Sequence, residues 1–359
     1  MRREPLVTLP PALLKPGTDT GARFVMGVDG GATKTLAAVL DVRTLKGTPS
    51  GAQAGEHTLH LGHGASSNAD AVGARAATES LVKATDEAIA RAGIAREQLD
   101  AAVLAIAGTD TDAVADHVRE NRPASWVVVN DVVGAWAAAT GAQPGVGAIS
   151  GTGSNVFGVG RDGRAWRAGG WGHVLGDEGS GYRLAVQSIR AALADRERSG
   201  PETALSAAAV DFFGVDSVEA LATLVYSKPL AKGEIAAFAV ETARVAHAGD
   251  AVARGLYERA AVELGRQVAA VIEQTGLSDD FPVGLIGSAF KAGALFVEPL
   301  TVAVHRVAPR ARVAVVEMAP VGGCLLLAAR VAGREQAVDS AELKPLLDAV
   351  LAREGVFRE

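Results

Sequence analysis

The chain has 359 residues, of which 48% are hydrophobic and 21% are charged, and it carries a net charge of −6. This composition is typical of a globular protein, and at roughly 150 residues per domain the length predicts two domains. The acidic balance argues against nucleic acid as a partner. No apolar run reaches the roughly 20 residues that span a bilayer, so no membrane partner is expected. The single cysteine, Cys324, cannot form an internal disulfide, which predicts a reducing, cytoplasmic location.

The first part of the chain alternates strands and helices. Residues 1–22 are rich in proline and are predicted to be a flexible extension. Apolar residues at helical spacing predict a helix over 70–92, which ends at Gly93. Buried strands are expected over four apolar stretches: 24–28, 36–42, 102–107 and 126–129.

The pattern then restarts with another strand and another glycine loop. Strands are expected over five further stretches: 146–149, 156–160, 165–167, 283–286 and 313–316. Residues 179–274 read as mainly helical, and two more helices are expected from Val321 and from Ser340. This order predicts an α/β protein, and the restart is a weak sign of a duplicated fold.

The first glycine loop runs from Gly27 to Thr35. Glycine amides can converge on an anion because no Cβ blocks close approach. Thr33 and Lys34 add a hydroxyl and a positive charge, and Asp29 at the strand end could hold a hydrated Mg²⁺. The alternative is a plain hairpin turn. A Walker A loop is excluded, because that motif needs Gly-Lys-Ser/Thr leading into a helix.

The second glycine loop, residues 150–155, also combines glycines with small hydroxyls after an apolar strand. Gly151, Thr152 and Gly153 are suited to phosphate oxygens, and a structural turn is again the alternative. Together the two loops could hold one triphosphate between them.

Three further stretches carry polar groups that could take part in binding or catalysis. Asp131 follows a strand, where it could accept the proton of an attacking hydroxyl, or the pair Asn130-Asp131 could simply cap a helix. The glycine-rich stretch 169–181 offers Trp171 as an apolar wall and Asp177 as a hydrogen-bond acceptor, with Glu178 as a candidate helix cap. Residues 66–68 are either a cap or a sugar contact.

These motifs together resemble the actin-like ATPase superfamily over about residues 24–335. The similarity is greatest to N-acetylglucosamine kinases in the group that contains BadF/BadG/BcrA/BcrD-type ATPases. The sequence of residues 169–181 is its specific part, and the motifs that carry it are these stretches: 27–35, 130–131, 151–155, 169–181, 285–288 and 320–323.

The resemblance implies a two-domain, actin-like (ribonuclease H-like) kinase with ATP and an amino sugar in an interdomain cleft. It implies residues 23–141 as the first domain, joined by a helix over 338–355, and residues 142–337 as the second. It also implies Mg²⁺ as cofactor, a homodimer, and phosphorylation of the 6-hydroxyl of N-acetylglucosamine.

The resemblance also implies roles for individual residues. Asp131 looks like the catalytic base, and Asp29 like the metal ligand. The implied sugar ligands are Asn68, Asp131, Asn155, Gly170, Trp171, Gly172 and Asp177. The implied nucleotide ligands are Gly30, Gly31, Thr33, Lys34, Gly151, Thr152, Gly153, Ala246, Gly287 and Ser288.

Three alternatives remain at this point. The first is a kinase for glucosamine or another hexosamine. The second is an ATPase that activates a radical dehydratase, but two copies of Cys324 in a dimer fall short of the four thiolates of an iron–sulfur cluster. The third is a sugar-sensing repressor, which would need a DNA-binding segment that residues 1–23 are too short to form.

Overall fold

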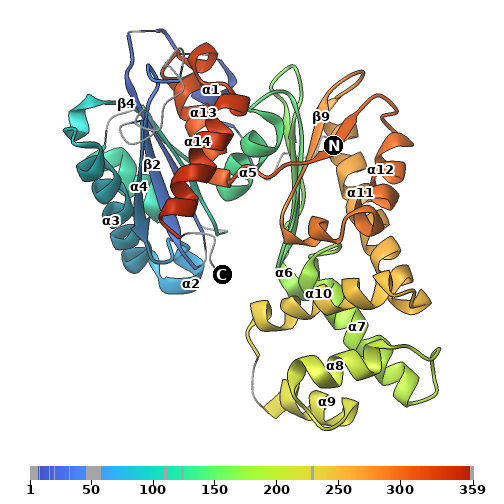
Figure 1. The fold of residues 1–359 in the computed structure, drawn as a ribbon. Helices are drawn as coiled ribbons and strands as arrows, with labels where there is room; N and C mark the ends of the chain where they lie inside the picture. The colour runs from blue at the N-terminus through green and yellow to red at the C-terminus, as the bar shows by residue number, and fades with distance from the viewer. Residues whose placement is uncertain are drawn as a thin grey trace. The chain divides into compact units, whose positions relative to one another are not determined.

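The computed structural model describes residues 7, 9–15, 17–19, 21–31, 33–45, 58–108, 112–122, 125–227 and 230–355. The chain divides into two compact units (Figure 1). The first comprises Met1–Pro144, Asp162–Ala165 and Met318–Glu359, and the second comprises Gly145–Arg161 and Trp166–Glu317. Within the described ranges, no helix combines the length and the apolar character needed to cross a membrane.

The first unit is built on a five-stranded sheet in the order β3-β2-β1-β4-β5. β1 pairs antiparallel with β2 and parallel with β4, and β4 pairs parallel with β5. The strands are β1 (Phe24–Gly30), β2 (Thr35–Asp41), β3 (Leu59–Gly64), β4 (Leu99–Ile106) and β5 (Trp126–Asn130). β1 and β2 are buried almost throughout, as expected for a sheet covered on both faces.

Helices cover both faces of this sheet. Side chains at alternate positions of β1, including Met26 and Val28, pack in one apolar cluster with Leu81. Gly27, between them, faces Cys324 and Leu325 on the opposite side. The helical segments of the first unit are α1 (Pro11–Leu14), α2 (Ala69–Val72), α3 (Ala74–Ala92), η2 (Arg96–Gln98), α4 (Asp112–Asn121), α5 (Asp131–Thr140), α13 (Pro320–Val331), η4 (Glu335–Ala337) and α14 (Ser340–Arg353).

Glycines let α3 lie close to the edge of the sheet. A Cβ at Gly62 would overlap the backbone of Ala84, and a Cβ at Gly64 would overlap the backbone of Ser80. The predicted helix over 70–92 is interrupted at Gly73, whose φ of 82° lies in the left-handed region.

The second unit repeats the strand order of the first. Its sheet has the order β10-β9-β6-β7-β8, so its first strand is again central, with its second and fourth strands beside it. β6 pairs antiparallel with β7 and parallel with β9, as β1 does with β2 and β4. The strands are β6 (Gly145–Ser150), β7 (Ser154–Val159), β8 (Ala165–Gly169), β9 (Pro282–Ile286) and β10 (Arg312–Val315). The sign of a duplicated fold in the sequence is therefore confirmed.

Residues 172–275 of the second unit are mainly helical. The core of this unit packs β6 and β7 residues against α11, with Phe238, Tyr257 and Phe296 among its largest buried side chains. The helical segments are α6 (Gly172–Leu175), α7 (Gly181–Arg196), α8 (Leu205–Phe213), α9 (Val218–Ser227), α10 (Lys232–His247), α11 (Ala251–Thr275), η3 (Ser288–Ala292) and α12 (Ala294–His305).

The domain boundaries differ from the predicted ones at both ends of the chain. The prediction kept residues up to 337 in the second domain, but the chain rejoins the first unit at Met318, and α13 packs on β1 and β4. The residues described before position 22 also differ from a flexible extension. Leu13 in α1 is 1% exposed, and the amide of Gly17 donates to the carbonyl of Arg330 at 2.9 Å. Apolar burial against α13 holds this segment in place.

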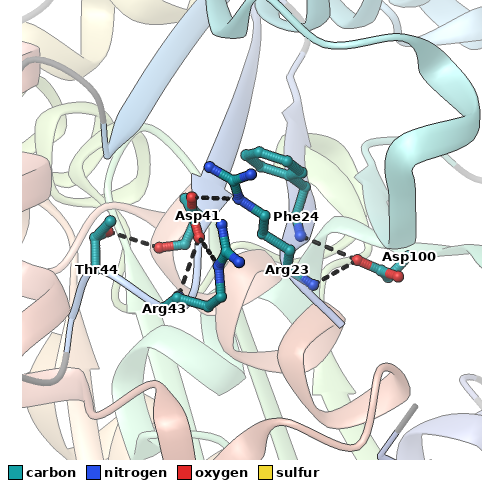
Figure 2. A network of polar contacts seen from close by, with 6 residues as sticks. All are labelled: Arg23, Phe24, Asp41, Arg43, Thr44 and Asp100. Carbon is teal, nitrogen blue, oxygen red and sulfur yellow. Dashed lines mark hydrogen bonds and ion pairs between the residues drawn. The ribbon is translucent and has the colours of Figure 1, made fainter. Parts of the chain in front are cut away.

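A charged network lies at the end of the first sheet opposite the glycine turn (Figure 2). The Nε of Arg23 donates to the Asp41 carboxylate at 2.7 Å, and Arg43 lies 3.5 Å from the other oxygen. Asp100 accepts from the backbone amides of Arg23 and Phe24 at 2.7 and 3.0 Å. Asp41 is thus a buried carboxylate with two cationic partners.

Candidate functional site

The β1–β2 turn is a tight loop that a side chain at Gly30 would break. A Cβ there would overlap the hydroxyl of Ser67, and the amide of Gly31 donates to the carbonyl of Lys34 at 2.9 Å. The two functional candidates of this turn, Thr33 and Lys34, are exposed. The hairpin predicted from the sequence is confirmed, and it leaves a hydroxyl and an ammonium group available to a ligand.

Two carboxylates meet at this end of the first sheet. Asp29 is near the end of β1, and Asp131 begins α5 directly after β5; because β1, β4 and β5 are parallel, their carboxyl ends share one edge. Burial and the negative charge of Asp131 raise the pKa of Asp29 from 3.8 to about 7, while Lys34 acts in the opposite direction. The pair is therefore an electrostatically strained site that a cation would relieve.

The sequence left open whether the pair Asn130-Asp131 caps a helix, and in the structure Asn130 is the residue that caps α5. Its side-chain oxygen accepts from the amide of Val132 at 3.3 Å, and its Nδ2 donates to the carbonyl of Gly108 at 3.1 Å. Asp131 is the first helical residue, where the helix dipole stabilises a negative charge. The cap and the candidate base are thus two different residues.

The stretch 66–68 lies beside the same turn. Asn68 caps α2, since its Oδ1 accepts from the amides of Asp70 and Ala71 at 2.9 and 3.2 Å. A Cβ at Gly108 would lie 3.2 Å from this Oδ1. Ser67 is fully buried next to Gly30, and its hydroxyl has no hydrogen-bond partner within the described ranges. A buried hydroxyl without a partner costs free energy, so it is a position at which a ligand group would be stabilising.

The second glycine loop, residues 150–155, lies beside another loop of the second unit, which contains Gly287 and Ser288. Gly287, with a φ of 127°, approaches so closely that a Cβ would overlap the carbonyl of Ser150. A Cβ at Gly151 would lie 3.8 Å from the hydroxyl of Ser288. The amide of Gly181, at the start of α7, donates to the carbonyl of Gly151 at 2.8 Å.

Two residues of this group, Thr152 and Ser288, have side chains suited to phosphate. Thr152 is exposed, and Gly153 closes the loop with a 2.9 Å hydrogen bond from the amide of Gly151 to its carbonyl. The structure therefore brings together five of the six predicted nucleotide ligands of the second unit: Gly151, Thr152, Gly153, Gly287 and Ser288.

Ala246 lies apart from that loop group. It is fully buried near the end of α10, and it lines a cavity of about 450 Å³. This cavity lies between the end of α10, α11 and the start of α12, and α12 follows η3, which begins at Ser288. Its lining residues are Ala246, His247, Arg254, Glu258, Ala294, Leu295, Glu298 and Pro299.

The stretch 169–181 contains a loop whose backbone conformation requires glycine at several positions. Gly169, Gly170 and Gly172 have φ values of 76°, 72° and 77°, which a side chain would disfavour. A Cβ at Gly170 would lie 2.6 Å from the amide nitrogen of Asn155, so the loop lies against the Asn155 side chain. The Oδ1 of Asn155 is buried without a partner among the described residues.

Trp171 stands out in this loop because it is 55% exposed. The Arg167 guanidinium lies 5.5 Å from the centroid of its ring. An exposed indole that contacts a neighbouring guanidinium on one face offers an apolar surface to a ligand.

Asp177 is a buried carboxylate of the second unit with an unusual backbone conformation. It is 3% exposed, and its φ of 64° is uncommon for a residue other than glycine. Its Oδ1 accepts from the amide of Ser154 at 3.2 Å, and its Oδ2 lies 2.7 Å from the Nζ of Lys232. Lys232 was missed by the sequence reasoning.

The helix after this loop is capped by a different residue from the predicted one. Ser180, not Glu178, accepts from the amide of Arg183 and caps α7. The Glu178 carboxylate instead accepts from Gln267 at 3.3 Å. A hydroxyl at the cap position is closer to the helix amides than the longer side chain two residues before it.

Comparisons with known proteins agree on one family. The sequence matches the model of the BadF/BadG/BcrA/BcrD ATPase family over residues 26–328. It is 31% identical over 258 residues to the N-acetylmuramic acid/N-acetylglucosamine kinase of Clostridium acetobutylicum, an alignment that covers 70% of this chain and 80% of that protein. It is 26% identical over 323 residues to the N-acetyl-D-glucosamine kinase of Dictyostelium discoideum, covering 84% and 97%.

A solved structure shares the fold. A protein from Chromobacterium violaceum, described as a candidate N-acetylglucosamine kinase, superimposes with a TM-score of 0.65 at 23% identity. The superposition covers 86% of this chain and 99% of that one.

Proposed function

Because the chain belongs to the BadF/BadG/BcrA/BcrD ATPase family, we propose that it is an ATP-dependent kinase that phosphorylates the 6-hydroxyl of N-acetylglucosamine. The fold is the α/β, actin-like ATPase fold that the sequence predicted. The observation that carries the proposal is the pair Asp29 and Asp131 beside the first glycine turn, in a chain 31% identical to a kinase of N-acetylated sugars.

Asp131 is the proposed catalytic base. Its carboxylate accepts the proton of the sugar 6-hydroxyl while the hydroxyl oxygen attacks the γ-phosphorus of ATP, and ADP leaves with the electrons of the broken phosphorus–oxygen bond. The start of α5 holds this carboxylate at the edge of the sheet, where the helix dipole stabilises a negative charge.

Asp29 is the proposed ligand of Mg²⁺. Mg²⁺ is usually held by one or two carboxylates together with phosphates and water. The described residues contain no group of three His, Cys, Asp or Glu side chains that could hold a metal alone, so phosphates and water would complete the shell. The raised pKa of Asp29 fits this role, because a cation would offset the repulsion from Asp131. When bound, Mg²⁺ would neutralise charge on the transferring phosphoryl group.

The proposed phosphate ligands are side chains and backbone amides of the glycine loops. In the first unit they are Thr33, Lys34 and the Gly30-Gly31 backbone; in the second they are Thr152, Ser288 and the backbone of Gly151, Gly153 and Gly287. The cavity that contains Ala246 is the proposed site of the base, because it lies at the end of η3, which begins at Ser288. Ala294, Leu295 and Pro299 give it apolar lining.

The proposed sugar ligands are polar groups next to these loops. Asn68 uses its Oδ1 as a helix cap, which leaves its amide nitrogen as the group to donate to a sugar hydroxyl. Asn155 offers a buried oxygen without a partner, and Asp177 offers a carboxylate. Trp171, between Gly170 and Gly172, offers an apolar wall for the methyl of the 2-acetamido group.

Substrate profiling tests the proposal directly. A coupled assay of ADP release would compare N-acetylglucosamine, glucosamine, N-acetylmuramic acid and glucose. We expect N-acetylglucosamine to have the highest kcat/KM, with glucose at least about 10-fold lower because it lacks the acetamido group that contacts Trp171. A higher kcat/KM for glucosamine would contradict the acetyl preference and establish the alternative hexosamine kinase, whereas no turnover of any sugar would contradict the kinase assignment.

A different class of function within the family is an activator ATPase that carries an iron–sulfur cluster. Cys324 is fully buried, and burial raises the pKa of its thiol well above the usual value. A cluster needs thiolates that can reach it. The only cysteine of the chain is therefore unsuited to that role.

ATP binding is expected to depend on both threonine hydroxyls. Thr33→Ala and Thr152→Ala should each raise the KM for ATP about 10-fold, because each removes a hydrogen bond to a charged phosphate. Initial rates at varied ATP and saturating N-acetylglucosamine measure this change. Thr78→Ala and Thr223→Ala are matched controls, since these hydroxyls donate to backbone carbonyls within their own helices. A wild-type KM for ATP in both loop variants would show that the phosphates bind elsewhere.

Three further properties complete the proposal. We propose that the protein needs Mg²⁺, forms a homodimer and acts in the cytoplasm. Removal of Mg²⁺ by EDTA should abolish turnover, and light scattering after gel filtration should give twice the chain mass.

A further inference from the structure

Lys232 is a half-buried partner of the proposed sugar site and lies far from that site in sequence. It begins α10, and the stretch 191–237 around it contains no recognisable motif. Its Nζ lies 2.7 Å from the Oδ2 of Asp177, at a separation of 55 residues along the chain. The Asp177 side chain is 4% exposed and that of Lys232 is 33% exposed.

The ammonium group also lies at the second phosphate loop. A Cβ at Gly153 would lie 3.1 Å from the Nζ of Lys232 and 3.1 Å from the Oδ1 of Asp177. The ring of Tyr182, in α7, is 6.0 Å from the same Nζ. Lys232 therefore lies within the second unit where the loop 169–181, the glycine loop 150–155 and α7 come together.

This contact orients the carboxylate without using all of its acceptor capacity. Each carboxylate oxygen can accept two hydrogen bonds. Lys232 occupies one position on Oδ2, and the amide of Ser154 occupies one on Oδ1 at 3.2 Å. No other donor to these two oxygens is found in the part of the chain that the structure describes, so one position on each oxygen is left, which is the arrangement that a pair of neighbouring sugar hydroxyls requires.

Local preferences do not account for the pair. A lysine at the first position of a helix is disfavoured by the helix dipole, and Asp177 has a left-handed backbone conformation. A buried ion pair adds little net stability over apolar packing, because desolvation offsets the attraction. Its specific effect is geometric, since it fixes the direction in which the carboxylate points.

We propose that Lys232 is a positioning residue for sugar binding, which holds the Asp177 carboxylate beside Gly153 in the orientation that accepts two sugar hydroxyls. This inference rests on the proposed function, in which Asp177 is a sugar ligand. Lys232 acts through Asp177 and not on the phosphates, so its removal should affect the sugar and leave ATP binding unchanged.

The test separates the two KM values. Lys232→Met should raise the KM for N-acetylglucosamine at least 10-fold, with the KM for ATP within two-fold of wild type. Lys232→Arg keeps the positive charge but changes its position, so it should raise the sugar KM less, about three-fold. In a cycle with Asp177→Asn, the double variant should lose no more sugar affinity than Asp177→Asn alone, because both changes remove one interaction.

Lys344→Met is the matched control. Lys344 forms a similar 2.6 Å pair with Asp348 in α14, and its loss should leave both KM values unchanged. If Lys232→Met does not fold, as judged by circular dichroism, Lys232→Arg carries the same comparison of the two KM values.

Two outcomes would overturn the inference. An increase in the KM for ATP as large as that for the sugar would show that Lys232 acts on the phosphates. A sugar KM within two-fold of wild type in Lys232→Met, with a large effect of Asp177→Asn, would show that Asp177 needs no positioning partner. If Asp177→Asn itself leaves the sugar KM unchanged, the proposed sugar site fails instead, so the two failures are distinguishable.

Discussion

Asp131→Asn should lower kcat by about 10²–10⁴-fold and leave the Kd for N-acetylglucosamine within a few-fold of wild type. An asparagine side chain has nearly the same shape, but it cannot accept the proton of the sugar hydroxyl in the transition state. Only an interaction made in the transition state is lost, so the loss should appear in kcat and not in ground-state binding. Single-turnover kinetics and isothermal titration with the sugar measure the two quantities separately.

The control for this change is Asp348→Asn. Asp348 lies in α14 and pairs with Lys344 four residues earlier, a half-exposed arrangement that contributes only a few tenths of a kcal/mol. It should therefore change neither kcat nor binding. A kcat for Asp131→Asn within ten-fold of wild type would remove Asp131 from the role of base and leave the family assignment intact.

The elements that the sequence predicted well are those that end in a strong local signal. The strands that become β1 and β5 are apolar runs that stop at Gly30 and at Asn130, and the helix α5 begins at the residue after its cap. The same signals place Asp29 and Asp131 at strand ends. Their proximity follows from the parallel pairing of β1, β4 and β5, which the alternation of strands and helices suggests.

The elements that were missed depend on tertiary contacts. β3 contains Gly62 and Gly64, which read as breakers, but they are glycines because α3 passes directly over them. α4 was also missed, although Val114 and Val118 lie four residues apart and are both buried, a spacing that indicates a helix. The return of α13 to the first unit also has no local signal, since its apolar face fits either core.

The residues of the candidate site also divide into those with a local sequence signal and those placed by tertiary contacts. Loops rich in glycine are visible in the sequence, because positive φ values and close backbone approach require glycine, as at Gly170 and Gly287. Lys232 is not visible, because its partner is 55 residues away and its own surroundings are ordinary. The buried hydroxyl of Ser67 was noticed only as a neighbour of Asn68, because its contact with Gly30 arises from packing.

Asp29→Asn should lower activity and raise the stability of the metal-free protein, and this opposite pair of effects is specific to a strained carboxylate. Losing the proposed Mg²⁺ ligand should lower kcat/KM for ATP by at least about 100-fold, on the scale of other losses of transition-state charge stabilisation. In the absence of Mg²⁺, however, the variant no longer carries a charge that is disfavoured by burial and by Asp131.

The stability difference should depend on pH in a defined direction. Because the folded-state pKa of Asp29 is about 7 and its ordinary value is 3.8, the folded protein binds this proton more tightly than the unfolded chain. The stability that the proton supplies is therefore fully present below pH 3.8 and is lost as the pH rises towards 7. With EDTA present, the melting temperature of the wild type should fall relative to that of Asp29→Asn between pH 5 and pH 8. Solvent screening of a partly exposed group limits the difference to about 1 kcal/mol, or roughly 2–4 °C.

Asp41→Asn is the contrasting control, because Asp41 is a buried carboxylate whose charge is compensated. It lies at the other end of β2, where Arg23 and Arg43 pair with it (Figure 2). Removing its charge should lower stability by about 1–3 kcal/mol and leave kcat/KM unchanged, since the arginines lose a charged hydrogen-bond partner. Added Mg²⁺ should raise the melting temperature of the wild type and of Asp41→Asn, but not that of Asp29→Asn. If Asp29→Asn instead melts below the wild type at pH 8 without Mg²⁺, the carboxylate is stabilised by contacts that outweigh Asp131, and the strained acidic pair is the wrong description of this end of the sheet.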